Sequence, residues 1–400
     1  MSNGASHKHR KLAVVLAGFC AFLTLFMTQP LLPAFASIFN ASKVAVSLTV
    51  TAATLGVALA APLIGNVADK LGRKRVIVWS AYLLAISTIL AATSTNLPTL
   101  IFWRLVEGVF TPGVFAITVA YIQEEWGGGG AGSATAAYVT GTVLGGFCSR
   151  LVSGFVGTHL NWQMSFVTIG VIGLLGATAL LIWLPMETKF VRRGQDHTTL
   201  SASLDHLKNR RLLATFITGS CILFSLLGSF TFITFYLAAP PFSLDPAALG
   251  SLFFVYLVGA VITPNSGRII DRFGQRLTVA FAIAFSMLGI LLTLSHNLAI
   301  VIAGLAIACS GVFVAQSCSS SYIGIAAKHN KALAVGLYVT FYYIGGSIGS
   351  SVPGYLWNVG GWPACVALFV AVQFITIFIA LLWWDKPVAP AREAAPVASR

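Results

Sequence analysis

Charged side chains are scarce in this sequence of 400 residues. Only 9% of the residues are charged, 57% are hydrophobic, and the acidic residues number 11. The mean hydropathy is +0.87. Soluble domains contain about a quarter charged residues and about 45–50% apolar residues. This composition therefore excludes a soluble globular domain.

Asp, Glu, Lys and Arg are missing altogether from six long runs of the sequence. These runs cover residues 12–42, 44–68, 151–186, 212–244, 277–327 and 332–384. A helix that crosses a bilayer needs roughly 20 apolar residues, so the longest runs hold two helices each. We therefore expect an all-α polytopic membrane protein with twelve spans. The expected spans lie near residues 12–36, 44–67, 76–95, 97–122, 133–157, 162–184, 212–238, 247–268, 276–295, 298–326, 332–357 and 362–384.

The sequence also lacks the motifs of common enzyme and metal sites. Its six cysteines all fall within apolar spans and form no CxxC pair, and its seven histidines show no HExxH spacing. The glycine run at residues 127–130 lacks the Gly-Lys-Ser/Thr ending of a phosphate-binding loop. We expect no catalytic site, no metal and no cofactor.

The excess of basic residues follows the predicted topology. With twelve spans and a cytoplasmic N-terminus, 21 of the 24 Lys and Arg residues lie in inward segments. Loops rich in Lys and Arg stay in the cytoplasm. The net charge of +13 is thus a topology signal that needs no nucleic-acid partner, and both termini are expected to be cytoplasmic. The apolar stretch at residues 12–36 is too long for the signal-peptide core of about 7–15 residues.

The two halves of the sequence repeat each other. Residues 138–162 align without a gap with residues 338–362, with eight identities. Such a repeat predicts two pseudo-symmetric six-helix bundles in parallel orientation. We expect an N-terminal bundle over residues 1–184, a cytoplasmic linker over 185–211, and a C-terminal bundle with a cytoplasmic tail over 212–400.

A short charged motif follows the second predicted span. The stretch GNVADKLGRKRV begins at Gly65, and a near copy, GRIIDRFGQRLT, begins at Gly267. This duplicated motif resembles motif A of the major facilitator superfamily, and the twelve spans extend the resemblance to the whole chain. The stretches TQPLLPAF, AYIQEEW and GGFCSRLVSG are similar to those of YnfM-like bacterial inner-membrane transporters. The resemblance implies a monomeric secondary transporter that works by alternating access.

The resemblance also implies that the motif forms a gating latch. Asp69 is placed to face the positive N-terminus of span 11, and Arg73 has candidate acidic partners at the end of span 4. These links would hold the two halves together in the outward-open state; the alternative is that the loop only anchors the topology. The second copy is expected to be weaker, because Gln275 replaces the arginine. The latch candidates are Gly65, Asp69, Gly72, Arg73, Glu124, Glu125, Asp271 and Gly274.

Three ionisable residues remain inside the spans: Arg104, Glu107 and Arg150. Each costs about 2.5–3.5 kcal/mol at the bilayer centre, so such residues face a cavity or a partner. Glu107 is a candidate proton carrier with Arg104 beside it, and the alternative is a permanent ion pair between them. Arg150 is a candidate for binding an anionic substrate group, and the alternative is a structural bond to helix carbonyls.

Polar residues in three spans are further candidates for substrate contact. Pro30 can break span 1 beside Gln29, and broken helices often mark substrate sites. The further candidates are Gln29, Thr234, Tyr236, Tyr338 and Tyr342, each with ordinary helix packing as the alternative.

We therefore expect a transporter of a small organic solute in the lipid bilayer of the bacterial inner membrane, working by proton-coupled efflux. The alternative is uptake or exchange of an anionic metabolite, with Arg104 and Arg150 as its clamp. A membrane-embedded enzyme is disfavoured, because the spans offer only one acid and no catalytic group set.

Overall fold

The computed structural model describes residues 2–126, 130–188, 205–262, 266–327 and 329–385, and these residues form helices and no strands. Part of the predicted linker and most of the predicted tail lie outside the described residues. The first half contains α1 (Ser2–Leu23), η1 (Gln29–Leu31), α2 (Leu32–Ile38), α3 (Lys43–Leu71), α4 (Arg73–Ala91), α5 (Leu97–Trp126), α6 (Ala131–His159) and α7 (Trp162–Trp183). The second half contains α9 (Arg210–Ala238), α10 (Pro246–Ser251), η3 (Leu252–Phe254), α11 (Val255–Ile262), α12 (Ser266–Leu292), α13 (Leu298–Ala326), α14 (Lys331–Ser351) and α15 (Pro353–Trp383).

Ten of the described helices are long and apolar enough to cross a membrane. Two predicted spans are broken instead of forming single long helices. The break expected at Gln29 and Pro30 is confirmed, because span 1 is divided among α1, η1 and α2. The described part of the span expected over residues 247–268 contains α10, η3 and α11 and the start of α12. A 3-10 turn at Leu252–Phe254 interrupts it, next to the place where Gly250 packs against the backbone of Arg150.

The boundary expected between the last two spans is confirmed, and span 11 contains a further break. Pro353 has no N–H to donate, and α14 ends before it at Ser351. The bend expected between spans 11 and 12 lies inside α15, where Gly360 and Gly361 leave helical geometry.

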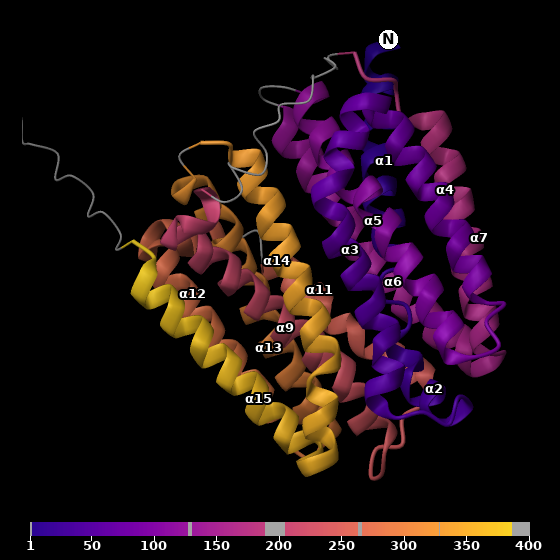
Figure 1. Cartoon of the computed structure of the whole chain (residues 1–400), viewed down its shortest axis with the longest axis vertical. Helices are drawn as coiled ribbons and strands as arrows, with labels where there is room; N and C mark the ends of the chain where they lie inside the picture. Colours follow the sequence, from indigo (N-terminus) through magenta and orange to yellow (C-terminus); the bar gives the residue numbers. More distant parts are fainter. Residues whose placement is uncertain (1, 127–129, 189–204, 263–265, 328, 386–400) are drawn as a thin grey trace, which may run out of the picture.

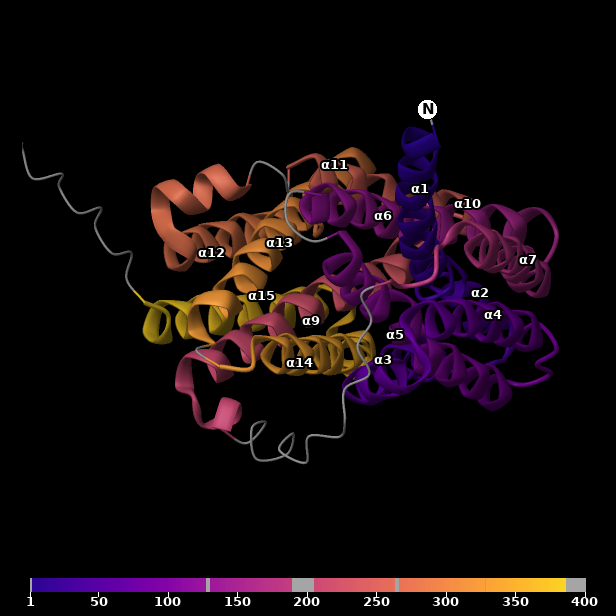
Figure 2. The same ribbon diagram turned by 90° about the horizontal axis from the view of Figure 1, so that it is seen from above.

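The helices form two groups, α1 to α7 and α9 to α15 (Figure 1). The groups diverge toward the end of the molecule where the N-terminus lies and converge at the other end (Figure 1). We call the diverging end, which carries Arg73, Lys74 and Arg210, the basic end, and the other the opposite end. Seen from above, α3 lies beside α14 and α6 beside α11 where the groups meet (Figure 2).

The two halves pack tightly at the opposite end. The hydroxyls of Thr51 and Ser350 lie 2.8 Å apart, as do those of Thr54 and Ser347. Gly154 on α6 lies against the backbone of Pro246, and a Cβ added to Gly154 would overlap it.

The internal repeat produces a second copy of this contact. The counterpart of Gly154 is Gly354, which packs against Val44, the counterpart of Pro246. A side chain at either glycine would therefore separate the halves at the opposite end.

At the basic end, the two halves are not packed against each other in this way. Five glycines in the described helices there would meet no atom within 4 Å if a Cβ were added: Gly65, Gly132, Gly267, Gly324 and Gly336. The hydrogen bonds between the halves among the described residues lie at or toward the opposite end. The structure therefore shows a molecule that is closed at the opposite end and open at the basic end.

Gly154→Val is expected to favour a conformation that is open at the opposite end, because the valine side chain overpacks the closed contact with Pro246. Overpacking costs about 1–3 kcal/mol, equivalent to a shift of roughly 5- to 150-fold in a conformational equilibrium. The reporter is Thr51→Cys in a chain without its native cysteines. We expect it to react with an impermeant maleimide at least about fivefold faster when Gly154→Val is added than when it is not. Gly132→Val on the same helix is the control, because Gly132 faces open space. Equal labelling in both variants would show that the contact does not hold the end closed.

Candidate functional site

Arg104 on α5 binds the break in span 1. Its guanidinium donates hydrogen bonds to the carbonyl oxygens of Thr24 at 3.0 Å, Leu25 at 2.5 Å and Thr49 at 3.1 Å. Helix α1 ends at Leu23, and a bilayer offers no water to the carbonyl groups that follow. Arg104 thus satisfies backbone groups that the broken span cannot satisfy by itself.

Glu107 lies one turn along α5 and forms an ion pair with Arg104. Both side chains are fully buried. One carboxylate oxygen, Oε2, accepts from the guanidinium, whereas Oε1 has no partner in hydrogen-bonding geometry among the described residues. The hydroxyl of Thr88, which donates to the carbonyl of Leu84, lies beside this carboxyl group. Arg104 and Glu107 are therefore ion-paired in this conformation.

Arg150 on α6 has a different environment, without a carboxylate. Its Nε donates to the amide oxygen of Gln29 at 2.7 Å, and its Nη1 donates to the carbonyl of Gly146 at 2.6 Å. Its Nη2 has no hydrogen-bond partner, and Arg150 forms no ion pair among the described residues. Gln29 also donates to Thr231 on α9 at 3.1 Å, so this group connects the two halves.

Three aromatic rings surround the Arg150 guanidinium. Its Cζ lies 4.6 Å from the ring centre of Phe26, 4.4 Å from that of Phe253 and 4.9 Å from that of Tyr256. A guanidinium within about 6 Å of a ring centre gains cation–π attraction, more so where water is excluded. The rings stabilise the buried charge without neutralising it.

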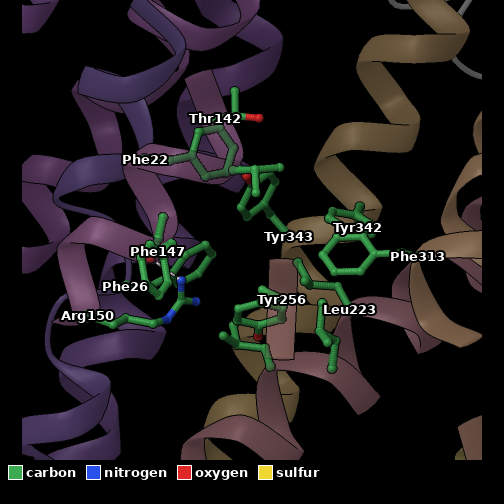
Figure 3. A pocket seen from close by; sticks show the side chains of 14 residues that line it. Phe22, Phe26, Thr142, Phe147, Arg150, Leu223, Tyr256, Phe313, Tyr342 and Tyr343 are labelled. Atoms are coloured by element: carbon green, nitrogen blue, oxygen red, sulfur yellow. Dashed lines mark hydrogen bonds between the residues drawn. The ribbon is translucent and has the colours of Figure 1, made fainter. Parts of the chain in front are cut away.

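A cavity of about 690 Å³ lies between the halves beside Arg150. It is lined mainly by aromatic and aliphatic side chains (Figure 3). The lining residues are Phe22, Phe26, Thr142, Val143, Gly146, Phe147, Arg150, Leu223, Leu226, Leu227, Tyr256, Phe313, Tyr342 and Tyr343. Arg150 is the charged residue of this set, and Figure 3 shows its guanidinium between Phe26 and Tyr256.

The structure brings some of the predicted substrate residues to this cavity and leaves others out. Arg150 and Tyr342 line it, and Gln29 lies behind Arg150. Three candidates bond elsewhere: Tyr338 donates to Gln316 at 3.0 Å, Thr234 to the carbonyl of Thr231 at 2.7 Å, and Tyr236 to the carbonyl of Ser295 at 3.3 Å.

Phe26 and Tyr256 were not identified from the sequence as residues of the central cavity. Tyr256 is the one tyrosine in its predicted span, which was the available signal.

Comparison with known proteins identifies the family. The family model of the Major Facilitator Superfamily matches residues 14–243 and 220–399 of this chain. The chain belongs to the major facilitator superfamily. It is similar to the uncharacterized MFS-type transporter YybF of Bacillus subtilis (strain 168), with 33% identity over 368 residues covering 92% of this chain and 91% of the relative. It is 30% identical over 374 residues to the inner membrane transport protein YnfM of Escherichia coli (strain K12), covering 93% of this chain and 88% of the relative.

A more distant relative and a solved structure complete the comparison. The 3-(3-hydroxy-phenyl)propionate transporter of Escherichia coli (strain K12) is 27% identical over 261 residues, which are 65% of this chain and 64% of the relative. The crystal structure of the nucleoside transporter NupG has a TM-score of 0.77 at 17% identity, covering 94% of this chain and all of that one. The predicted all-α fold and the resemblance to YnfM are confirmed, and the chain is a membrane transporter and not an enzyme.

The motif A residues of this superfamily member lie at the basic end. Arg73 binds Glu124 through two hydrogen bonds of 3.1 and 2.8 Å and pairs with Asp69 at 2.7 Å. All three residues belong to the first half, so these pairs cannot by themselves join the halves as predicted. They are also formed while the basic end is open, and Asp69 makes no hydrogen bond to α14 among the described residues.

Gly72 and Gly274 occupy equivalent turns in the two copies of the motif. Their φ angles are +94° and +73°, a backbone conformation that favours glycine. At these two positions the backbone conformation is therefore what requires glycine. Gly65 faces open space in this conformation.

The remaining latch candidates have different surroundings. Glu125 accepts hydrogen bonds from the backbone N–H and hydroxyl of Thr188 at 2.7 and 2.8 Å and lies 3.7 Å from Arg10. Asp271 is exposed and forms no ion pair among the described residues.

Replacing Arg104 by Met is expected to destabilise the transporter strongly. The change leaves Glu107 as an unpaired buried charge, which typically costs about 3–5 kcal/mol. Adding Glu107→Gln should restore part of the apparent unfolding temperature in detergent, because it removes that charge. Arg211→Met is the control, since Arg211 pairs with Asp385 at the exposed surface and such pairs contribute about 0–1 kcal/mol. If the single and double variants unfold at the same temperature, the ion pair does not carry the effect.

Proposed function

We propose that this transporter moves a small organic monoanion with an aromatic or similarly flat apolar body. The observation that carries the proposal is the Arg150 guanidinium. It lines the cavity between the halves with a free Nη2 and no carboxylate partner among the described residues. The proposal favours the anionic substrate that was the alternative prediction from the sequence.

The chemistry of the cavity supports this substrate class. A substrate carboxylate would give Nη2 a charge-assisted hydrogen bond, which is roughly twice as strong as a neutral one. Aromatic rings pack against flat apolar groups, and the hydroxyls of Tyr256, Tyr342 and Tyr343 have no hydrogen-bond partner within the described part of the chain. One cation in the lining set favours a single negative charge on the substrate. The relative that is named for an aromatic carboxylate supports the same class.

Arg104 takes no part in this anion site. Its three nitrogen atoms already bind carbonyl groups and Glu107, and it does not line the cavity. The predicted two-arginine clamp is therefore reduced to Arg150 in this proposal.

Alternating access moves this cavity between the two sides of the membrane. We place the chain in the inner membrane as a monomer with both termini in the cytoplasm, because the basic loops favour this orientation. The open basic end then faces the cytoplasm. The latch around Arg73 would act with span 11 when that end closes.

Substrate uptake into proteoliposomes tests the anion site. With the purified chain, we expect saturable flux of 3-phenylpropionate and little flux of its neutral amide. Arg150→Gln should lower the anion flux at least about tenfold, since a hydrogen bond to a charged group contributes about 1.5–3 kcal/mol. Arg211→Gln removes a cation outside the cavity and should leave the flux unchanged. Amide flux equal to anion flux, or an unaffected Arg150→Gln variant, would refute the proposal.

Proton coupling through Glu107 is a second candidate function. The observation that favours it is the fully buried carboxyl group, whose Oε1 accepts no hydrogen bond from the residues that the structure describes. A buried acid in a span is costly and marks a proton pathway in many transporters. Arg104 keeps its backbone bonds in either protonation state, so a proton can leave Glu107 without dismantling the break in span 1.

Everted vesicles with a pH-sensitive dye test this coupling and its direction. Adding 3-phenylpropionate to the wild type should produce a pH change whose sign separates proton-coupled efflux from proton-coupled uptake. Glu107→Gln should abolish the pH change while the exchange of labelled for unlabelled anion continues. Asp205→Asn, which removes an exposed acid, should behave as the wild type. A pH change that persists in Glu107→Gln would assign the proton to another group.

A further inference from the structure

A second cavity lies on the outer surface of the first half, between α4 and α7 at the basic end. We call it the α4–α7 groove, and its volume is about 1020 Å³. It is lined by Lys74, Arg75, Val78, Trp79, Tyr82, Ile86, Leu181 and Met186, and it shares no lining residue with the central cavity. It therefore has no part in the substrate site.

The floor of the α4–α7 groove is apolar and faces the lipid. Trp79 is 66% exposed and Leu181 is 49% exposed. The hydroxyl groups of Tyr82 and Thr178 lie 3.0 Å apart and join the two helices. Tryptophan and tyrosine concentrate at membrane interfaces, where their rings reach the apolar region and their polar atoms reach the head groups. The groove thus runs from the interface into the hydrocarbon layer.

Two cations stand at the mouth of the groove. Lys74 and Arg75 belong to the first turn of α4, and neither side chain forms an ion pair within the described part of the chain. An acidic residue, Glu187, contacts the backbone of this turn: its carboxylate accepts a hydrogen bond from the backbone N–H of Lys74 at 3.2 Å. Glu187 therefore caps the start of α4, and the neighbouring Arg73 is already bound to Asp69 and Glu124.

The second half contains a groove without such charges. It lies on α12 and α13, has a volume of about 980 Å³, and no charged residue lines it. Its Phe281 is the repeat counterpart of Trp79 in the first half. The second wall of this groove is α13, the repeat counterpart of α5, so the groove is not the copy of the α4–α7 groove. It is a groove of similar size that lacks the two unpaired cations.

We propose that the α4–α7 groove binds an anionic phospholipid. The phosphate lies between Lys74 and Arg75, and an acyl chain lies along Trp79 and Leu181. Basic pockets between spanning helices bind anionic head groups, with each cation adding to the attraction. A zwitterionic phospholipid fills the same apolar floor but gains less from the two cations, because its head group carries no net charge.

Quenching of Trp79 fluorescence by brominated lipids tests this proposal. The full chain is reconstituted with brominated phosphatidylglycerol or brominated phosphatidylcholine, and the signal of Trp79 is obtained by subtracting the Trp79→Phe variant. We expect half-maximal quenching at a fraction of phosphatidylglycerol on the order of tenfold lower than that of phosphatidylcholine. In Lys74→Gln/Arg75→Gln the two lipids should quench equally, whereas Lys74→Arg/Arg75→Lys should keep the preference.

Two controls separate a specific site from general surface charge. Lys208→Gln/Arg210→Gln removes the same charge from the basic end of the second half and should leave the preference at Trp79 unchanged. Phe281→Trp in the Trp79→Phe chain places the reporter in the uncharged groove, where no preference is expected. The proposal is overturned if Trp79 shows no preference for phosphatidylglycerol, or if the preference survives Lys74→Gln/Arg75→Gln. It is also overturned if Lys208→Gln/Arg210→Gln abolishes the preference at Trp79, or if the Phe281→Trp reporter shows the same preference.

Discussion

A broken helix inside a bilayer must find protein partners for its carbonyl groups, and this requirement organises the first half of the transporter. Span 1 breaks after Leu23, and the carbonyl oxygens that follow bind side chains from other helices. Arg104 binds those of Thr24 and Leu25, and Ser153 binds that of Met27 at 2.7 Å. An arginine buried for this purpose needs a counter-charge, which Glu107 supplies. The most costly residues in the membrane thus stabilise an irregular backbone, and the same pairing engages only one of the two carboxylate oxygens of Glu107.

The break also positions the groups around the central cavity. Gln29 lies in the short 3-10 helix after the break, where it binds both Arg150 and Thr231. The internal repeat relates Arg150 to Ser350 and Phe253 to Thr51. One interface between the halves therefore contains a hydroxyl pair, whereas the equivalent interface contains a guanidinium on an aromatic ring. The two copies of one architecture have diverged, and the copy with Arg150 provides a cation beside an apolar cavity.

Much of this arrangement follows from the sequence because it depends on local patterns. Charge-free runs predict the spans, the repeat predicts two halves, and the spacing of Arg104 and Glu107 predicts that they meet on one helix face. The cavity does not follow in the same way. Phe26 and Tyr256 meet Arg150 only through the packing of helices far apart in the sequence. Tyr236 and Thr234 were assigned to the cavity from composition alone, because an apolar helix gives no periodic signal for which face meets lipid and which meets protein.

The distribution of glycines links the structure to its mechanism. A glycine within a helix costs about 0.5–1 kcal/mol relative to alanine. At the opposite end, Gly154 and Gly354 offset this cost, because Gly154 lets α6 touch the backbone of Pro246 and Gly354 makes room for the side chain of Val44. At the basic end, Gly65, Gly267 and Gly336 also lie in helices but face open space, so they gain no contact in this conformation. A chain that works by alternating access must close both ends in turn. Glycines that make no contact at the open basic end are therefore available for close helix packing when that end closes.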